Sequence, residues 1–126
     1  MEKSNILMIQ FTIPGKPIPK ARARVTRRGW AYTPKRTMQG ENLVKMIGLA
    51  RRAASKLSIS EGSFRLQVIC YGANPLADWD NLGKLISDAL NGVFWKDDRQ
   101  VIDARVMKLP CAKGQERTEV QIESLQ

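Results

Sequence analysis

Histidine is absent from the 126-residue sequence, and aromatic residues make up only 6% of it. Without histidine the chain has no Ser-His-Asp or Cys-His nucleophilic site, no histidine-ligated zinc and no histidine general base. Any hydrolytic chemistry must therefore come from carboxylates, lysine, a hydroxyl group or a metal ion held by carboxylates.

Cysteine is scarce as well, and long apolar runs are missing. Cys70 and Cys111 form no CxxC pair and are too few for a disulfide framework, so two reduced thiols are expected. No apolar stretch approaches the roughly 18 residues of a membrane span, and the first residues lack a signal-peptide pattern. The length suits one domain, residues 1–126, and the absences favour a cytoplasmic protein that binds no membrane.

The charge is strongly basic and unevenly placed. Twenty-one Lys and Arg against twelve Asp and Glu give a net charge of +9. Residues 3–40 contain no acidic residue and these nine basic ones: Lys3, Lys16, Lys20, Arg22, Arg24, Arg27, Arg28, Lys35 and Arg36. All six aspartates lie later in the chain: Asp78, Asp80, Asp88, Asp97, Asp98 and Asp103. The basic first third predicts a polyanionic partner such as nucleic acid.

Hydrophobic periodicity predicts an α+β domain. Residues 7–13 alternate apolar and polar side chains as a half-buried strand does, and residues 14–36 read as a basic loop or irregular hairpin with its tip at 27–30. A helix is predicted from about residue 37 to 57. Its expected buried face consists of Leu43, Ile47, Ala50, Ala54 and Leu57.

The second half of the sequence adds further strands and one more helix. Residues 64–71 alternate as a strand, and residues 80–91 have the apolar spacing of a second helix with Asp80 as its N-cap. Runs 101–109 and 117–125 flank a turn and suggest a closing antiparallel hairpin.

The aspartates have the spacing of a metal site. In an extended Asp78-Trp79-Asp80 segment both carboxylates would lie on one face, roughly 7 Å apart, where they can share Mg²⁺ or Mn²⁺. Asp97-Asp98 lies where the chain can return to the same sheet edge, although the pair also fits a plain turn. Lys84 follows Asp80 by four residues, on the same helical face, where it can face a phosphate.

Each of these residues also has a purely structural interpretation. Asp80 alone is more often a helix cap than a metal ligand, and Lys84 with Asp88 is more often a solvated ion pair. Trp79 and Trp95 are expected in the core more often than stacked on bases. Only the coincidence of several such residues favours an active site.

The run DWDNLGKLISDALNGVFWKDDRQVIDARV resembles the signature of the RusA family of Holliday-junction resolvases, which are small endonucleases of bacteria and their phages. The stretch FTIPGKPIPKARARVTRRGWAYTP resembles the family's basic opening, so the similarity covers about residues 9–123. Ala23 departs from the pattern, because relatives often have proline between the two arginines.

The resemblance implies a mixed β-sheet with two main helices, a homodimer, and an endodeoxyribonuclease of DNA recombination and repair. Such an enzyme resolves four-way DNA by paired symmetric phosphodiester hydrolysis and needs Mg²⁺, which Mn²⁺ can replace. The implied catalytic residues are Asp78, Asp80, Lys84 and Asp98, with the three aspartates as metal ligands. Asn81, Asp88 and Asp97 would support them, Asp88 by orienting Lys84. The predicted contacts to DNA phosphates are Lys16, Lys20, Arg22, Arg24, Arg27, Arg28, Lys35 and Arg36.

Two other classes of protein stay open. A non-catalytic basic DNA-binding module would use the carboxylates as caps and surface pairs. A strand transferase with Tyr32 or Tyr71 as nucleophile lacks the arginines and histidines expected around such a tyrosine. At the loop tip, Trp30 either wedges between bases or, as is commoner for a loop tryptophan, folds back on the core.

Overall fold

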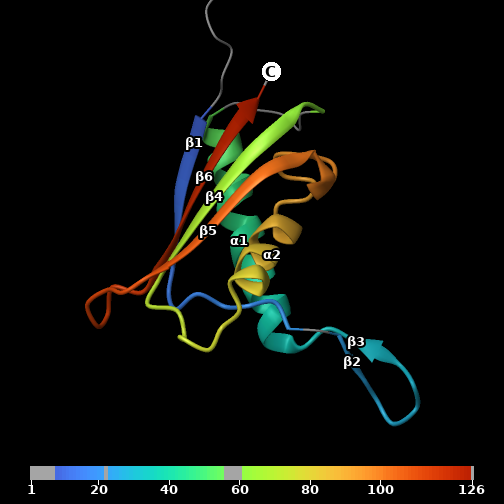
Figure 1. The fold of residues 1–126 in the computed structure, drawn as a ribbon. Coiled ribbons are helices and arrows are strands. Elements are labelled where there is room, and N and C mark those ends of the chain that lie inside the picture. The colour runs from blue at the N-terminus through green and yellow to red at the C-terminus, as the bar shows by residue number, and fades with distance from the viewer. Residues whose placement is uncertain (1–7, 22, 56–60, 126) are drawn as a thin grey trace, which may run out of the picture.

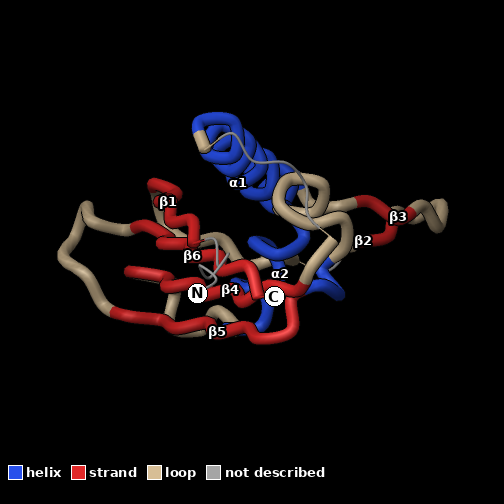
Figure 2. Tube along the Cα trace, turned by 90° about the horizontal axis from the view of Figure 1, so that it is seen from above, coloured by secondary structure: helices blue, strands red, loops and turns tan. Residues whose placement is uncertain are grey.

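A computed structural model describes residues 8–21, 23–55 and 61–125. A four-stranded sheet has the order β1-β6-β4-β5, and both α-helices lie on one of its faces (Figure 1, Figure 2). The sheet strands are β1 (Met8–Pro14), β4 (Ser63–Tyr71), β5 (Val101–Leu109) and β6 (Arg117–Leu125). The helices are α1 (Lys35–Ala54) and α2 (Trp79–Ala89). The predicted α+β fold with two main helices and a mixed sheet is confirmed.

The predicted hairpin between the last two strands is wrong. β6 pairs antiparallel with both β1 and β4, and β5 pairs parallel with β4 on its other side. Because α2 carries the chain across the sheet between β4 and β5, β5 returns in the same direction as β4, as in a β-α-β unit. The prediction paired β5 with β6 because they are neighbours in the sequence. In the structure β5 forms an edge of the sheet.

The core lies between the sheet and the helices. The alternate residues of β4, from Phe64 to Cys70, are buried against the apolar face of α2. Trp95 is fully buried, its ring 5.3 Å from that of Phe64, so its expected place in the core is confirmed. Both cysteines are free, as expected, and burial raises the pKa of the Cys70 thiol to about 11. Neither described helix is long and apolar enough to cross a membrane.

The buried face of α1 differs from the predicted one. Its buried residues are Thr37, Gly40, Val44 and Gly48. Leu43 and Ile47 are only half-buried, Ala50 and Ala54 are exposed, and Leu57 lies outside the described residues. A Cβ atom on Gly48 would lie 2.8 Å from the Leu90 side chain, so the helix approaches α2 and the loop after it through glycine. A hydrophobic pattern cannot reveal such a face, because glycine carries no apolar side chain.

The basic segment forms a small hairpin that projects from the body of the molecule (Figure 1). Its strands are β2 (Arg24–Val25) and β3 (Ala31–Tyr32), and the Thr26 N–H donates to the Trp30 carbonyl at 2.9 Å. The predicted irregular hairpin is thus confirmed. Trp30 is 72% exposed, so the expectation that it folds back on the core is wrong. Arg22 lies outside the described residues.

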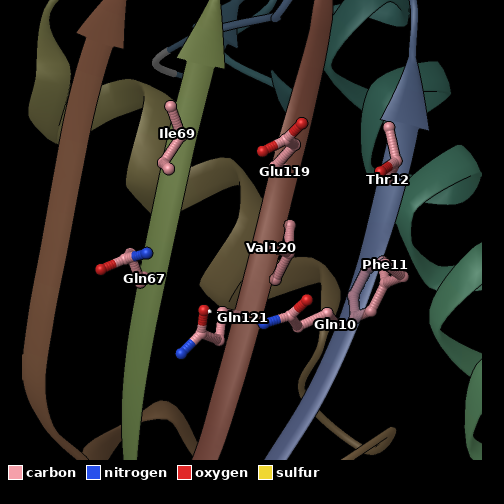
Figure 3. Close-up of a pocket in the computed structure, with 8 residues that line it drawn as sticks. All are labelled: Gln10, Phe11, Thr12, Gln67, Ile69, Glu119, Val120 and Gln121. Carbon is pink, nitrogen blue, oxygen red and sulfur yellow. Dashed lines mark hydrogen bonds between the residues drawn. The ribbon is translucent and has the colours of Figure 1, made fainter.

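The face of the sheet opposite the helices is not covered by any described element (Figure 2). A shallow hollow of about 410 Å³ lies on it, crossing β1, β6 and β4 (Figure 3). It is lined by Gln10, Phe11, Thr12, Gln67, Ile69, Glu119, Val120 and Gln121. The lining is mainly polar, in contrast to the apolar face that packs on the helices.

Candidate active site

The start of α2 places the first two aspartates. Asp78 is the N-cap, and its Oδ1 accepts a hydrogen bond from the Asp80 N–H at 3.0 Å. Asp80 therefore lies in the first turn, where the positive end of the helix dipole stabilises its negative charge. The predictions that Asp80 caps the helix and that residues 78–80 are extended are both wrong, because the helix begins one residue after Asp78.

A groove between α2 and β5 brings three of the predicted catalytic side chains together. It encloses about 290 Å³ and is lined by Leu66, Trp79, Asp80, Gly83, Lys84, Ser87, Asp98, Val101, Ala104 and Val106. Asp80 and Lys84 lie on α2, one helical turn apart, and Asp98 reaches the groove from the segment that leads into β5. Asp78 is not part of the lining.

Asp98 begins a short 3-10 turn, η1 (Asp98–Gln100), which Asp97 caps. The Asp97 carboxylate accepts from the Arg99 N–H at 2.9 Å and pairs with the Arg99 guanidinium at 3.4 Å. The hydrogen bond from the Arg99 backbone is the main cause that lowers the pKa of Asp97. Asp97 therefore has a structural role at the turn that holds Asp98.

The environment of Asp98 disfavours its charged form. Burial raises its pKa, and a hydrogen bond and repulsion from Asp88 raise it further. Two carboxylates this close need a cation to offset their repulsion. A metal ion bound at Asp98 would offset the repulsion between the Asp88 and Asp98 carboxylates.

Lys20 supplies such a cation, which sequence reasoning missed. Its ammonium group pairs with Asp88 and lies 3.9 Å from Glu41, and the pair with Asp88 is the main cause that raises the pKa of Lys20. Its backbone N–H donates to the Asn81 carbonyl at 2.8 Å. Asp88 is thus paired with Lys20 rather than with Lys84, and Lys20, predicted to contact DNA, fastens the basic segment to α2. Lys20 and Asp88 are 68 positions apart in the sequence, so no local sequence pattern indicates that they pair.

The remaining residues are one aromatic residue, one amide and six exposed cations. Trp79 lines the groove but is 60% exposed, so its predicted place in the core is wrong. Asn81 is half-buried and contributes its carbonyl to the contact with Lys20. The other described candidates for phosphate contacts are all exposed: Lys16, Arg24, Arg27, Arg28, Lys35 and Arg36.

The donor set fits a divalent cation only in part. Within the described ranges no three His, Cys, Asp or Glu side chains are grouped closely enough to hold one ion. Asp80 and Asp98 nevertheless line one groove, and Mg²⁺ commonly uses one or two carboxylates together with waters and substrate phosphate. The groove therefore fits such an ion through two carboxylates, whereas the predicted trio with Asp78 is not assembled.

Fold and groove together describe a small basic α+β protein in which two carboxylates and a lysine line one groove and a cationic hairpin projects from the body (Figure 1), as expected of a nucleic-acid-binding protein. The family model of endodeoxyribonuclease RusA matches residues 14–123. The chain belongs to the RusA family, as its sequence motifs indicate.

Named relatives agree with this assignment. The crossover junction endodeoxyribonucleases RusA of Shigella sonnei and of Escherichia coli K12 are each 33% identical over 96 residues, which is 75% of this chain and 72% of theirs. The protein of the same name from Enterobacteria phage 82 is 55% identical over 38 residues, 29% of this chain and 32% of that one.

One solved structure shows a similar fold. A protein of unknown function from Agrobacterium tumefaciens aligns with all of this chain and 79% of its own, with a TM-score of 0.53 and 9% identity. At that identity the likeness concerns the fold alone.

Proposed function

We propose that this protein is a structure-selective endodeoxyribonuclease that resolves four-way DNA junctions in recombination and repair, in the cytoplasm of a bacterium or of a phage-infected cell. The observation that carries the proposal is the meeting of Asp80, Lys84 and Asp98 in one groove, from two segments of a chain that belongs to an endonuclease family. Its relatives are named crossover junction endodeoxyribonucleases.

Asp80 and Asp98 would hold a Mg²⁺ or Mn²⁺ ion in this proposal. Asp78 would support them from outside the groove lining, because its carboxylate caps α2 and accepts from the Asp80 N–H. Such an ion, when bound, would supply a water of lowered pKa and would offset the charge that develops on the phosphate. With no histidine in the chain, these carboxylates are the groups suited to this task.

The protein's own cations divide the remaining work. Lys84 holds a fixed positive charge in the groove, where negative charge develops on the cleaved phosphate. The exposed arginines of the β2–β3 hairpin bind backbone phosphates and give affinity without reading sequence. Lys20 pairs with Asp88, which would lower the repulsion between Asp88 and an ionised Asp98 that holds the metal ion.

A homodimer completes the proposal. One chain has one such groove, whereas resolution of a four-way junction needs incisions in two strands related by a two-fold axis. Two copies related by the same symmetry supply two grooves. The paired cuts then follow from the symmetry of the complex.

Aspartate variants separate the nuclease from a non-catalytic DNA-binding module. Asp80→Asn and Asp98→Asn should abolish cleavage of a labelled junction while binding stays equal or tightens, because each change removes a negative charge near phosphate. Asp103→Asn is the matched control, since its carboxylate pairs with Arg65 and lies outside the groove lining. Cleavage by Asp98→Asn at the wild-type rate would refute the assignment of the site.

A further inference from the structure

Trp79 is an exposed aromatic residue inside the acidic motif. It follows the helix cap Asp78, precedes Asp80, and is 60% exposed although it lines the groove. An indole left in water beside charged groups contributes little to stability, because it buries little apolar area. Its position favours a role in binding.

The groove behind Trp79 has an apolar floor and a charged rim. Leu66 and Gly83 are buried and Val101 and Val106 are half-buried, so these residues form the floor. Asp80 and Lys84 are exposed and form the rim together with the half-buried Asp98. Gly83 keeps the walls close, since a Cβ atom there would lie 2.6 Å from the Val106 side chain. A planar aromatic group attached to a phosphate matches this combination of an apolar floor and a charged rim.

The hairpin tryptophan has a different setting. Trp30 shares its hollow with Thr26, Arg27 and Arg28 only, so no apolar floor faces it. That surface suits a phosphate backbone, whereas the groove behind Trp79 suits the face of a base.

We propose that the groove between α2 and β5 receives a nucleobase unstacked at the branch point, with Trp79 stacked on it at the mouth. The proposal rests on the proposed nuclease function and names the part of the DNA that the site binds. The phosphate of the same nucleotide then lies at the rim, between Lys84 and the two aspartates. Bases at a branch point are the least firmly stacked, so junctions offer such a base more readily than linear duplex does.

The test crosses a protein change with a DNA change. An abasic nucleotide is placed in turn at each position next to the mapped incision, and single-turnover cleavage is measured for wild type and Trp79→Ala. Base–aromatic stacking predicts about a tenfold or larger loss for either change alone. The two changes together should lose no more than one of them, because both remove the same contact.

Three further variants serve as controls for Trp79→Ala. Trp79→Phe should retain most of the rate, and Ala104→Leu, which fills the groove and leaves Trp79 in place, should lose about as much as Trp79→Ala. For Trp30→Ala, the fold-loss of cleavage rate should multiply with the fold-loss caused by the abasic nucleotide.

Several results would overturn the proposal: losses from Trp79→Ala and the abasic change that multiply, full activity of Ala104→Leu, or equal cleavage of intact and abasic junctions. If wild type cut no junction at all, the proposed nuclease function itself would fail, which is a separate outcome.

Discussion

Lys84 carries the fixed positive charge of the groove, and its replacement gives the first prediction. Lys84→Ala should lower the rate of cleavage by roughly 2 to 4 kcal/mol in activation free energy, with a much smaller loss of junction binding. Single-turnover kinetics and a binding isotherm measure the two effects. Lys45→Ala, an exposed lysine on α1, is the control. If binding fell as far as the rate, Lys84 would be a docking residue.

The pKa of Asp98 links the site to stability. In the folded, metal-free protein the pKa of Asp98 is raised, so the ionised form of Asp98 destabilises the fold. This loss of folding free energy is absent below the ordinary carboxyl pKa of about 4 and grows as the pH rises through the raised pKa. Asp98→Asn should therefore unfold at higher urea concentration than wild type at about pH 7 in excess chelator, and the difference should vanish toward about pH 4. Equal midpoints at both pH values would contradict this account of Asp98.

At the residue scale the sequence indicated which side chains gather in one groove better than it indicated their partners. Asp80, Lys84 and Asp98 meet as their motif indicates. The partner of Asp88 and the exposure of Trp79 were not predictable, because both depend on where the basic segment and β5 pack against α2.

The elements were predictable where side chains alternate. The strand pattern of β4 and β6 shows plainly in their sequences, because one face of each is buried. Two features were not accessible: α1 packs through Gly40 and Gly48, which carry no hydrophobic signal, and β5 is an exposed edge strand whose neighbour is set by the α2 crossover.

The β2–β3 hairpin should contribute a salt-dependent share of affinity. Each phosphate contact adds about 0.9 to the slope of log K against log salt on duplex DNA, so Arg28→Ala should flatten the slope by about that amount. Lys113→Ala, in the exposed turn between β5 and β6, is the matched loss of one positive charge and should leave the slope unchanged. An unchanged slope for Arg28→Ala would mean that the hairpin faces away from DNA.

Two surfaces among the described residues are candidates for the interface of the proposed dimer. The strand from Phe64 was one sequence-based candidate; β4 is an inner strand, so only its side chains on the open sheet face remain available. The exposed methionines of α1 are the other candidate. Either surface would place two grooves in a symmetric pair.

The free protein should sediment at about twice 14.2 kDa, and a junction in a plasmid should be cut to linear products by near-simultaneous incisions. Met46→Glu on α1 and Ile69→Glu on the open sheet face probe the two surfaces, and one of them should yield monomers. A monomer both free and on DNA, with products nicked in one strand only, would contradict the paired mechanism.

Cleavage of a labelled four-way junction, compared with linear duplex of the same sequence with and without Mg²⁺, tests the central claim most directly. The account predicts paired cuts in the junction, only with the cation present, and little cutting of the duplex. Cleavage that persists in excess chelator, or equal cleavage of duplex and junction, would contradict it.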